Sequence, residues 1–161
     1  MADILVLTTG GTIDKVYFDA LSEFQVGDTM IPRLLEVGLV KLDVAVKEIA
    51  RKDSLDLDDA DRARLRAAIE TAPETRIVIT HGTDTMTDTA AVLKDIAGKT
   101  ICMLGALSPA RFAESDATFN LGMAFGVVQS AAPGIYIAMN GTVFDAQKVR
   151  KDRALGAFVA K

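Results

Sequence analysis

Five short hydrophobic runs are spaced along the chain, and stretches with helical character separate them. The runs are rich in β-branched or large apolar residues, which is typical of strands buried on both faces. They cover residues 4–7, 44–49, 77–80, 101–104 and 135–139. The alternation of such strands with helices predicts a mostly parallel sheet.

Four helices are predicted between these strands. The clearest covers about Leu57–Thr71, where Asp56 is placed to cap it, and its charged residues are interpreted as a solvated face. The other three are predicted at about residues 31–36, 85–96 and 118–130. No repeat, low-complexity tract or linker divides the chain. We therefore expect residues 1–161 to form one doubly wound, three-layer α/β domain of the Rossmann or flavodoxin-like type, with helices on both faces of the sheet.

Composition and charge narrow the class of partner. Half of the 161 residues are hydrophobic, so one domain can bury a substantial core without disulfides or metal. The net charge is −4 and the basic residues are dispersed, which argues against nucleic acid and favours a small-molecule partner. Cys102 lies within an apolar run and is expected to be a buried small hydrophobe. No basic leader or bilayer-length hydrophobic segment is present, so we expect a cytoplasmic protein without a membrane partner.

Polar and glycine-rich segments follow the first and the third predicted strands. They are Thr9-Gly10-Gly11-Thr12 and Thr80-His81-Gly82-Thr83-Asp84-Thr85. Glycine permits positive φ and close backbone approach, which leaves amides able to bind an anion or oxyanion, while the threonines supply hydroxyls. Ordinary turn chemistry, with Asp84 as a helix cap, is the alternative interpretation. A nucleotide site is weakly supported, since the first turn lacks both G-x-G-x-x-G and the P-loop lysine.

The segments Thr9–Ile13 and His81–Met86 resemble the two signature segments of bacterial-type L-asparaginases. The similarity continues through Ser54 with Asp56, and then to Lys151 near the end of the chain. It also includes residues 115–116, 119–121 and 139–143. The resemblance implies a hydrolase that releases ammonia from the side-chain amide of asparagine, glutamine or a related small amide. It implies a threonine acyl-enzyme intermediate and no metal or organic cofactor.

The resemblance also assigns roles to individual residues. Thr12 would be the nucleophile, Thr83 the second catalytic threonine, and Lys151 with Asp84 the remainder of a Thr-Lys-Asp triad. Ser54 would bind the α-carboxylate or α-amino end of the substrate.

The chemistry of these groups is coherent, because a threonine hydroxyl is a poor nucleophile until a base accepts its proton. Lys151 is the available base, and desolvation would lower its pKa while Asp84 would favour its ammonium form. Membership of a surface charge cluster is the alternative for Lys151. Backbone N–H groups around Gly11 and Gly82 are candidate oxyanion donors.

His81 is the only histidine and lies outside the catalytic set of the family. We therefore expect it to be packed and hydrogen-bonded rather than a base. The family also has a tyrosine on the mobile loop after the first signature, where this chain has Phe24. Tyr17 is the candidate substitute if the loop 14–28 folds over the site as a lid, and the alternative is a packing aromatic.

Asparaginases normally carry a second, C-terminal domain that completes a neighbouring subunit's active site. The resemblance covers only the first domain, so we expect an open pocket or one rebuilt by self-association into a dimer or larger homo-oligomer. Two other functions remain open. The chain could be a noncatalytic amino-acid-binding domain or a subunit that needs a partner chain. In a third interpretation, the Gly/Thr turns are relics on a stable sheet.

Overall fold

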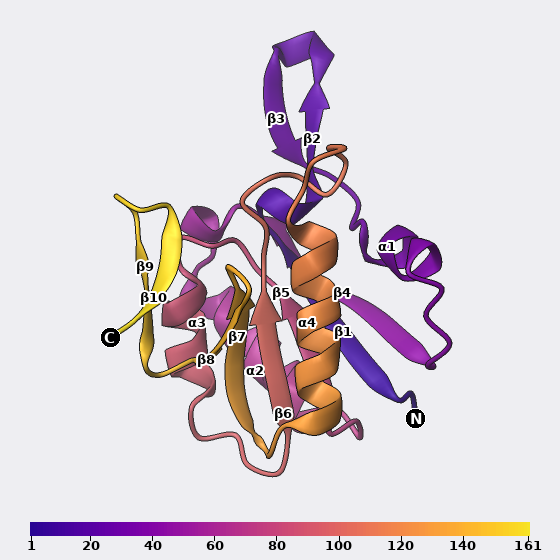
Figure 1. Cartoon of the computed structure of the whole chain (residues 1–161), viewed down its shortest axis with the longest axis vertical. Helices are drawn as coiled ribbons and strands as arrows, with labels where there is room; N and C mark the ends of the chain where they lie inside the picture. Colours follow the sequence, from indigo (N-terminus) through magenta and orange to yellow (C-terminus); the bar gives the residue numbers. More distant parts are fainter.

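The computed structural model describes residues 1–161, and a six-stranded sheet forms its centre (Figure 1). In spatial order the strands are β4 (Val44–Lys52), β1 (Ile4–Gly10), β5 (Arg76–Thr80), β6 (Thr100–Leu104), β7 (Gly134–Met139) and β8 (Thr142–Asp145). All pairings from β4 to β7 are parallel, and β8 pairs with β7 antiparallel. The mostly parallel sheet is thus confirmed, and β8 is an addition made possible by the tight turn at Asn140-Gly141, where φ is 53° and 68°.

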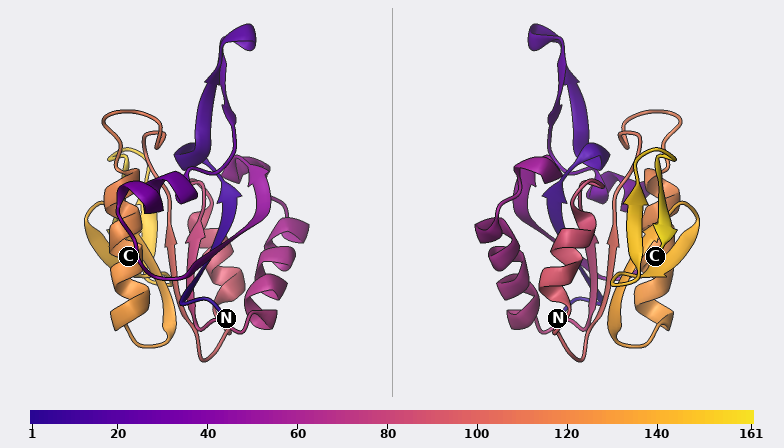
Figure 2. Two further views of the ribbon diagram at one scale, coloured as in Figure 1. Left: turned by 90° about the vertical axis from the view of Figure 1, so that its right-hand side faces the viewer. Right: turned by 90° about the vertical axis from the view of Figure 1, so that its left-hand side faces the viewer.

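Helices cover both faces of this sheet (Figure 2). The helical elements are α1 (Ile31–Val37), α2 (Asp59–Thr71), α3 (Met86–Leu93), α4 (Ala117–Ser130) and the short 3-10 turns η1 (Thr12–Asp14), η2 (Asp19–Leu21) and η3 (Ser54–Asp56). Helices α2 and α3 lie on one face, and α1 and α4 lie on the other. The predicted doubly wound α/β class with three layers is therefore confirmed.

Alternation along each strand supplies two separate cores. In β1, Leu5 and Leu7 pack with residues of α2 and α3, whereas Ile4 and Val6 pack with residues of α1 and α4. The same alternation in β5 and β6 makes residues 77–79 and 101–104 hydrophobic without interruption, which explains why the sequence shows continuous apolar runs. Cys102 belongs to the second core, where burial raises the pKa of its thiol to about 12, as expected for a packed small residue.

Two helix boundaries differ from the prediction. Helix α2 is capped by Asp58 rather than Asp56, because Asp58 and Asp61 form a reciprocal capping box while Asp56 closes the η3 turn. Helix α3 ends at Leu93 rather than at Ile96, since the Ile96 N–H donates to the Leu93 carbonyl and tightens the chain into a turn.

Two antiparallel hairpins were not predicted. The segment expected to be a loop contains β2 (Lys15–Phe18) and β3 (Glu23–Val26), and this β2–β3 hairpin projects beyond the carboxyl ends of the parallel strands (Figures 1 and 2). The second hairpin pairs β9 (Val149–Asp152) with β10 (Ala157–Ala160) beside α3. None of the helices has the length and apolar character needed to span a bilayer.

Candidate active site

The candidate site lies where the winding of the sheet reverses. The chain leaves β1 to form β4 on one side and returns to form β5 on the other side, so β1 lies between them. In open α/β sheets such a switch point opens a crevice at the carboxyl ends of the strands, where ligands bind. The two predicted threonine-containing segments follow β1 and β5, the two strands that border this point.

Three loops meet there through direct backbone contact. A Cβ added to Gly11 would lie 2.5 Å from both Cα and N of Gly82, and one added to Gly82 would lie 2.6 Å from Cβ of Ser54. Gly11 also has a φ of 86°, which disfavours any residue with a side chain. The loops after β1, β5 and β4 are therefore packed against one another, and each carries one of the predicted site residues Thr12, Thr83 and Ser54.

The Gly11 amide does not serve as a free donor in this arrangement. Its N–H donates to the carbonyl of Lys52 at 2.9 Å, which ties the loop after β1 to the end of β4. Oxyanion donors around these glycines would have to come from other amides. The need for glycine at position 11 comes from the close approach of Gly82.

Thr83, Asp84 and Lys151 are brought together from distant parts of the chain. Lys151 Nζ donates to Thr83 Oγ1 and to Asp84 Oδ1, at 2.7 Å in each case. The contact spans 68 and 67 residues of sequence and depends on β9, which places Lys151 beside the start of α3. Arg153 adds a second, longer ion pair to Asp84, at 3.7 Å.

Burial distinguishes Lys151 from the charged residues around it. Its side chain is 17% exposed, whereas that of Lys148 is 80% exposed and that of Arg153 is 68% exposed. The alternative of a simple surface charge cluster describes Lys148, but Lys151 points inward to a threonine and a carboxylate. The structure therefore brings Lys151, Thr83 and Asp84 together, and their catalytic roles stay predictions.

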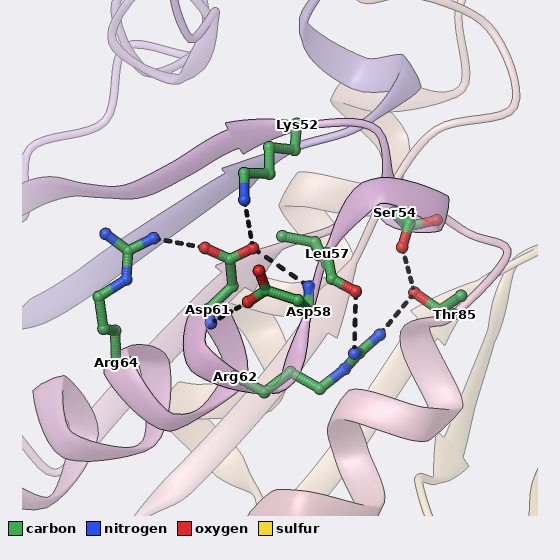
Figure 3. Close-up of polar contacts among 8 residues, drawn as sticks. All are labelled: Lys52, Ser54, Leu57, Asp58, Asp61, Arg62, Arg64 and Thr85. Carbon is green, nitrogen blue, oxygen red and sulfur yellow. Dashed lines mark hydrogen bonds and ion pairs between the residues drawn. The ribbon is translucent and has the colours of Figure 1, made fainter.

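Ser54 carries a buried hydroxyl without a partner. The residue is 1% exposed, and its Oγ makes no hydrogen bond within the chain. Its carbonyl, by contrast, accepts a hydrogen bond from Thr85 Oγ1 at 2.8 Å (Figure 3). A buried polar group without a partner is uncommon in native structures, so this hydroxyl is a candidate ligand-binding group.

His81 is packed within the protein, as expected. It is fully buried, with Nδ1 2.7 Å from the Gly82 carbonyl and Nε2 2.7 Å from Thr89 Oγ1. Burial lowers the pKa of its imidazole to about 4. Because a carbonyl only accepts, Nδ1 carries the proton and Nε2 accepts from the Thr89 hydroxyl. The lone pair needed for general-base chemistry is thus occupied.

Tyr17 lies on the projecting β2–β3 hairpin. It is directly opposite Phe24 in the hairpin register, and the two rings meet edge-on with centroids 5.5 Å apart. Phe24 contacts Phe112 in turn, at 5.9 Å. Tyr17 is half exposed, so the arrangement is that of a packing aromatic on a projecting hairpin.

The base of this hairpin is held by a buried carboxyl group. Asp14 is 1% exposed, and its Oδ1 accepts the N–H of Met30 at 2.8 Å. Burial raises the pKa of Asp14 to about 6, although the hydrogen bonds from Met30 and Thr29 oppose this rise. Arg111 donates to the backbone carbonyls of Asp14 and Asp28, so a residue from the loop after β6 also braces the hairpin.

A polar network that was not predicted from the sequence lies below the site. The composition around Arg62 indicates a solvated face, yet its guanidinium donates to Thr85, the N-cap residue of α3 (Figure 3). It also donates to Thr89 within this helix. The spacing of these threonines by four residues, which places them on one face of α3, was an available signal. Nearby, the buried carboxylate of Asp61 pairs with Lys52 and joins the end of β4 to α2.

Comparison with known proteins identifies a matching family. The family model described as asparaginase, N-terminal, matches residues 3–159. The chain is 32% identical over 163 residues to a protein of Haemophilus influenzae named probable L-asparaginase periplasmic, covering 94% of this chain and 46% of that protein. The chain thus spans about half the length of this relative.

The chain is also similar to a protein with a different name and to a solved structure. The chain is 29% identical over 157 residues to a glutamyl-tRNA(Gln) amidotransferase subunit of Methanococcus vannielii, covering 90% of this chain and 36% of that protein. Among solved structures, that of a probable cytoplasmic L-asparaginase from Campylobacter jejuni superimposes with a TM-score of 0.85 at 28% identity. This match covers 99% of the chain and 54% of the other protein.

Proposed function

The chain belongs to the family of the asparaginase N-terminal domain, and we propose that it hydrolyses the side-chain amide of asparagine or a related small amide. In the proposed reaction, the Thr12 hydroxyl attacks the amide carbon. Cleavage of the C–N bond releases ammonia and leaves an ester on Thr12, which water hydrolyses to aspartate and the free hydroxyl.

The proposed proton acceptor is the Lys151 amine. When neutral, it would accept the Thr12 proton through the Thr83 hydroxyl, which lies 2.7 Å from Nζ. Asp84, also at 2.7 Å, would stabilise the ammonium that forms until the proton passes to the departing ammonia. Ser54 would bind the charged end of the substrate, because its buried hydroxyl is without a partner. Gly11 and Gly82 contribute by allowing the loops to approach. Tyr17 remains a proposed assistant only if the hairpin folds toward Thr12.

The proposal rests on one observation above the others, namely the convergence of Lys151, Thr83 and Asp84 from two distant segments. The test is ammonia release from L-asparagine and L-glutamine by the purified chain, compared with Thr12→Ala and Lys151→Met. We expect each substitution to lower kcat at least about 100-fold, the lower limit for losing general acid–base assistance.

Lys148→Met is the matched control for the lysine, since it removes an exposed lysine at the start of the same hairpin. It should retain the native rate. An unchanged rate in Thr12→Ala would eliminate this nucleophile, and a native chain that releases no ammonia from either substrate would refute the proposed activity for this chain.

A second function is favoured by one comparison, because a relative is named as an amidotransferase subunit. In this alternative, the chain binds an amino acid without turnover or acts with a partner chain. Calorimetry with L-aspartate that shows binding without ammonia release from L-asparagine would support it. We also propose self-association and a cytoplasmic location; sedimentation and cell fractionation test these two proposals.

A further inference from the structure

Arg62 reaches from α2 toward the underside of the candidate site. Its Nη2 donates to Thr85 Oγ1 at 3.2 Å and its Nε donates to Thr89 Oγ1 at 3.0 Å (Figure 3 shows the Thr85 contact). A third bond runs from Nη1 to the Leu57 carbonyl at 3.0 Å, which fixes the guanidinium against its own helix start. One planar group thereby holds two hydroxyls of α3 at fixed positions.

Each of these hydroxyls passes a hydrogen bond on to a loop of the site. Thr85 Oγ1 donates to the Ser54 carbonyl at 2.8 Å, and Thr89 Oγ1 lies 2.7 Å from His81 Nε2. The other ring nitrogen of His81 donates to the Gly82 carbonyl at 2.7 Å. The network therefore has two branches, one ending at the backbone of Ser54 and the other at the backbone of Gly82.

The hydrogen bonds from Arg62 agree in direction with those set by the Ser54 and Gly82 carbonyls at the two ends of the network. A guanidinium only donates, so both threonine oxygens accept from it and turn their own protons outward, toward the Ser54 carbonyl and His81 Nε2. This matches the tautomer that the Gly82 carbonyl requires, with the His81 proton on Nδ1. A neutral residue at position 62 would leave the hydroxyl protons free to turn elsewhere.

The two branches end at residues that touch one another. Gly82 packs against Ser54 so closely that an added Cβ would lie 2.6 Å from the Ser54 Cβ, and Thr83 follows Gly82 directly. A small shift of either loop would change the distance between the proposed substrate-binding hydroxyl and the Thr83–Lys151 pair. We infer that Arg62 is a positioning residue that keeps the Ser54 and Gly82 loops aligned for substrate binding and turnover. This inference rests on the proposed function.

The test compares Arg62→Met with Arg66→Met in the same helix. Arg66 is a matched control, because it also bonds to α3, through the Val92 carbonyl, and pairs with Glu70, but it has no contact with the site. With L-asparagine as substrate, Arg62→Met should raise KM and lower kcat, each by about tenfold, the effect of losing one hydrogen bond to a charged group. Arg66→Met should lower the Tm while leaving KM and kcat within twofold.

The branches are separated by two nearly isosteric substitutions. Thr85→Val cuts the branch to Ser54 and should mainly raise KM, whereas Thr89→Val cuts the branch to Gly82 and should mainly lower kcat. These milder variants keep the inference testable if Arg62→Met does not fold, and Arg62→Lys should restore only part of the loss because it has no planar fork. Arg62→Met that folds and keeps both constants within twofold would overturn the inference, as would identical effects of the two threonine variants.

A readout that needs no turnover separates this inference from the proposed function. His81 is the only histidine, so its imidazole resonances are assigned directly by NMR. The positive charge of Arg62 helps to keep the pKa of His81 low, against the opposing effect of Asp88. Arg62→Met should therefore raise this pKa from about 4, and Arg66→Met should leave it unchanged.

Failure of the proposed function and failure of the positioning role of Arg62 then give different results. A native chain that is inactive toward both amides, with His81 responding to Arg62→Met, refutes the proposed function and leaves the network in place. A native chain that is active, with His81 and the kinetic constants unmoved in Arg62→Met, refutes the positioning role alone.

Discussion

Asp14→Asn should make the protein more stable at neutral pH and leave it nearly unchanged in mild acid. Asp14 is buried at the base of the β2–β3 hairpin, and burial raises its pKa from 3.8 to about 6. Because the folded state favours the protonated form, this group contributes stability that is fully present below pH 3.8 and lost as the pH rises through about 6. A rise of about two units corresponds to about 3 kcal/mol.

Asparagine is close to an isostere of the protonated acid. Its side-chain oxygen can still accept the Met30 N–H, and it carries no charge at any pH. The free energy of unfolding of Asp14→Asn should therefore exceed that of the native chain by about 3 kcal/mol at pH 7.5, and by only about 0.5 kcal/mol at pH 4.

The stability of Asp14→Asn must be compared with that of the native chain at each pH. In the native chain alone, the titration of another group masks the effect of Asp14 on the free energy of unfolding. The pKa of His81 is lowered from 6.5 to about 4, so its contribution is present above pH 6.5 and lost as the pH falls through about 4. This loss is also about 3 kcal/mol and has the opposite sign to the gain from Asp14. The native chain should thus show a flattened dependence between pH 6.5 and 4.

Urea unfolding followed by far-UV circular dichroism at several pH values measures the difference, since the chain has no tryptophan for fluorescence. Asp95→Asn removes an exposed carboxylate and serves as the control, with an expected change near zero at every pH. If Asp14→Asn differs from the native chain by the same amount at pH 7.5 and pH 4, burial of the Asp14 charge is not the cause.

Two further predictions concern the contacts beneath the site. Gly11→Ala should lower the free energy of unfolding by about 3 kcal/mol, because its Cβ would collide with the backbone of Gly82. Gly98 has a similar φ of 73° but open space around it, so Gly98→Ala should cost only about 1 kcal/mol. Urea unfolding midpoints compare the two variants, and equal losses of stability would contradict the clash. Asp61→Asn should cost about 2 kcal/mol at pH 7, since the Lys52 bond holds the pKa of Asp61 well below its usual range. Stability from such a group is fully present above pH 3.8 and is lost as the pH falls through the low pKa of the folded state, so the gap between the two urea curves should begin to narrow only below pH 3.8. A gap that stays constant in stronger acid would refute this.

The sequence predicted the central sheet because the strands buried on both faces, such as β1, β5 and β6, contain uninterrupted hydrophobic runs. The β2–β3 hairpin was missed for the opposite reason. Its strand Lys15–Phe18 is partly or fully exposed along its length, so burial imposes no pattern on it, and its pairing depends on Glu23–Val26 opposite. The hairpin containing Lys151 gave an equally weak signal, since its first strand is mostly charged. Its place beside α3 is a tertiary contact without a local signature.

The candidate site was predictable where chemistry and backbone shape occur in one short segment. Gly82, Thr83 and Asp84 are contiguous, and their composition indicates a tight turn with functional groups. The contact of Gly11 with Gly82 required knowing that β1 and β5 are neighbours, which the order of strands decides. The alternation of strands and helices alone does not specify that order.

The local sequence pattern does not distinguish Arg62 from the neighbouring arginines of the same helix. Arg62, Arg64 and Arg66 occur at alternate positions in one helix, and all three fit a solvated face by composition. Their environments differ because residues four apart share a helix face, so Arg62 and Arg66 both point at α3 while Arg64 pairs with Asp61 on the other side. The groups that face these two arginines differ. Arg62 donates to two hydroxyls that lead to the site, whereas Arg66 donates to a carbonyl that does not. The rotation of α2 about its axis relative to α3 therefore decides which arginine is connected to the site. This is why the kinetic comparison of Arg62→Met with Arg66→Met tests the geometry of the site rather than the charge of the helix.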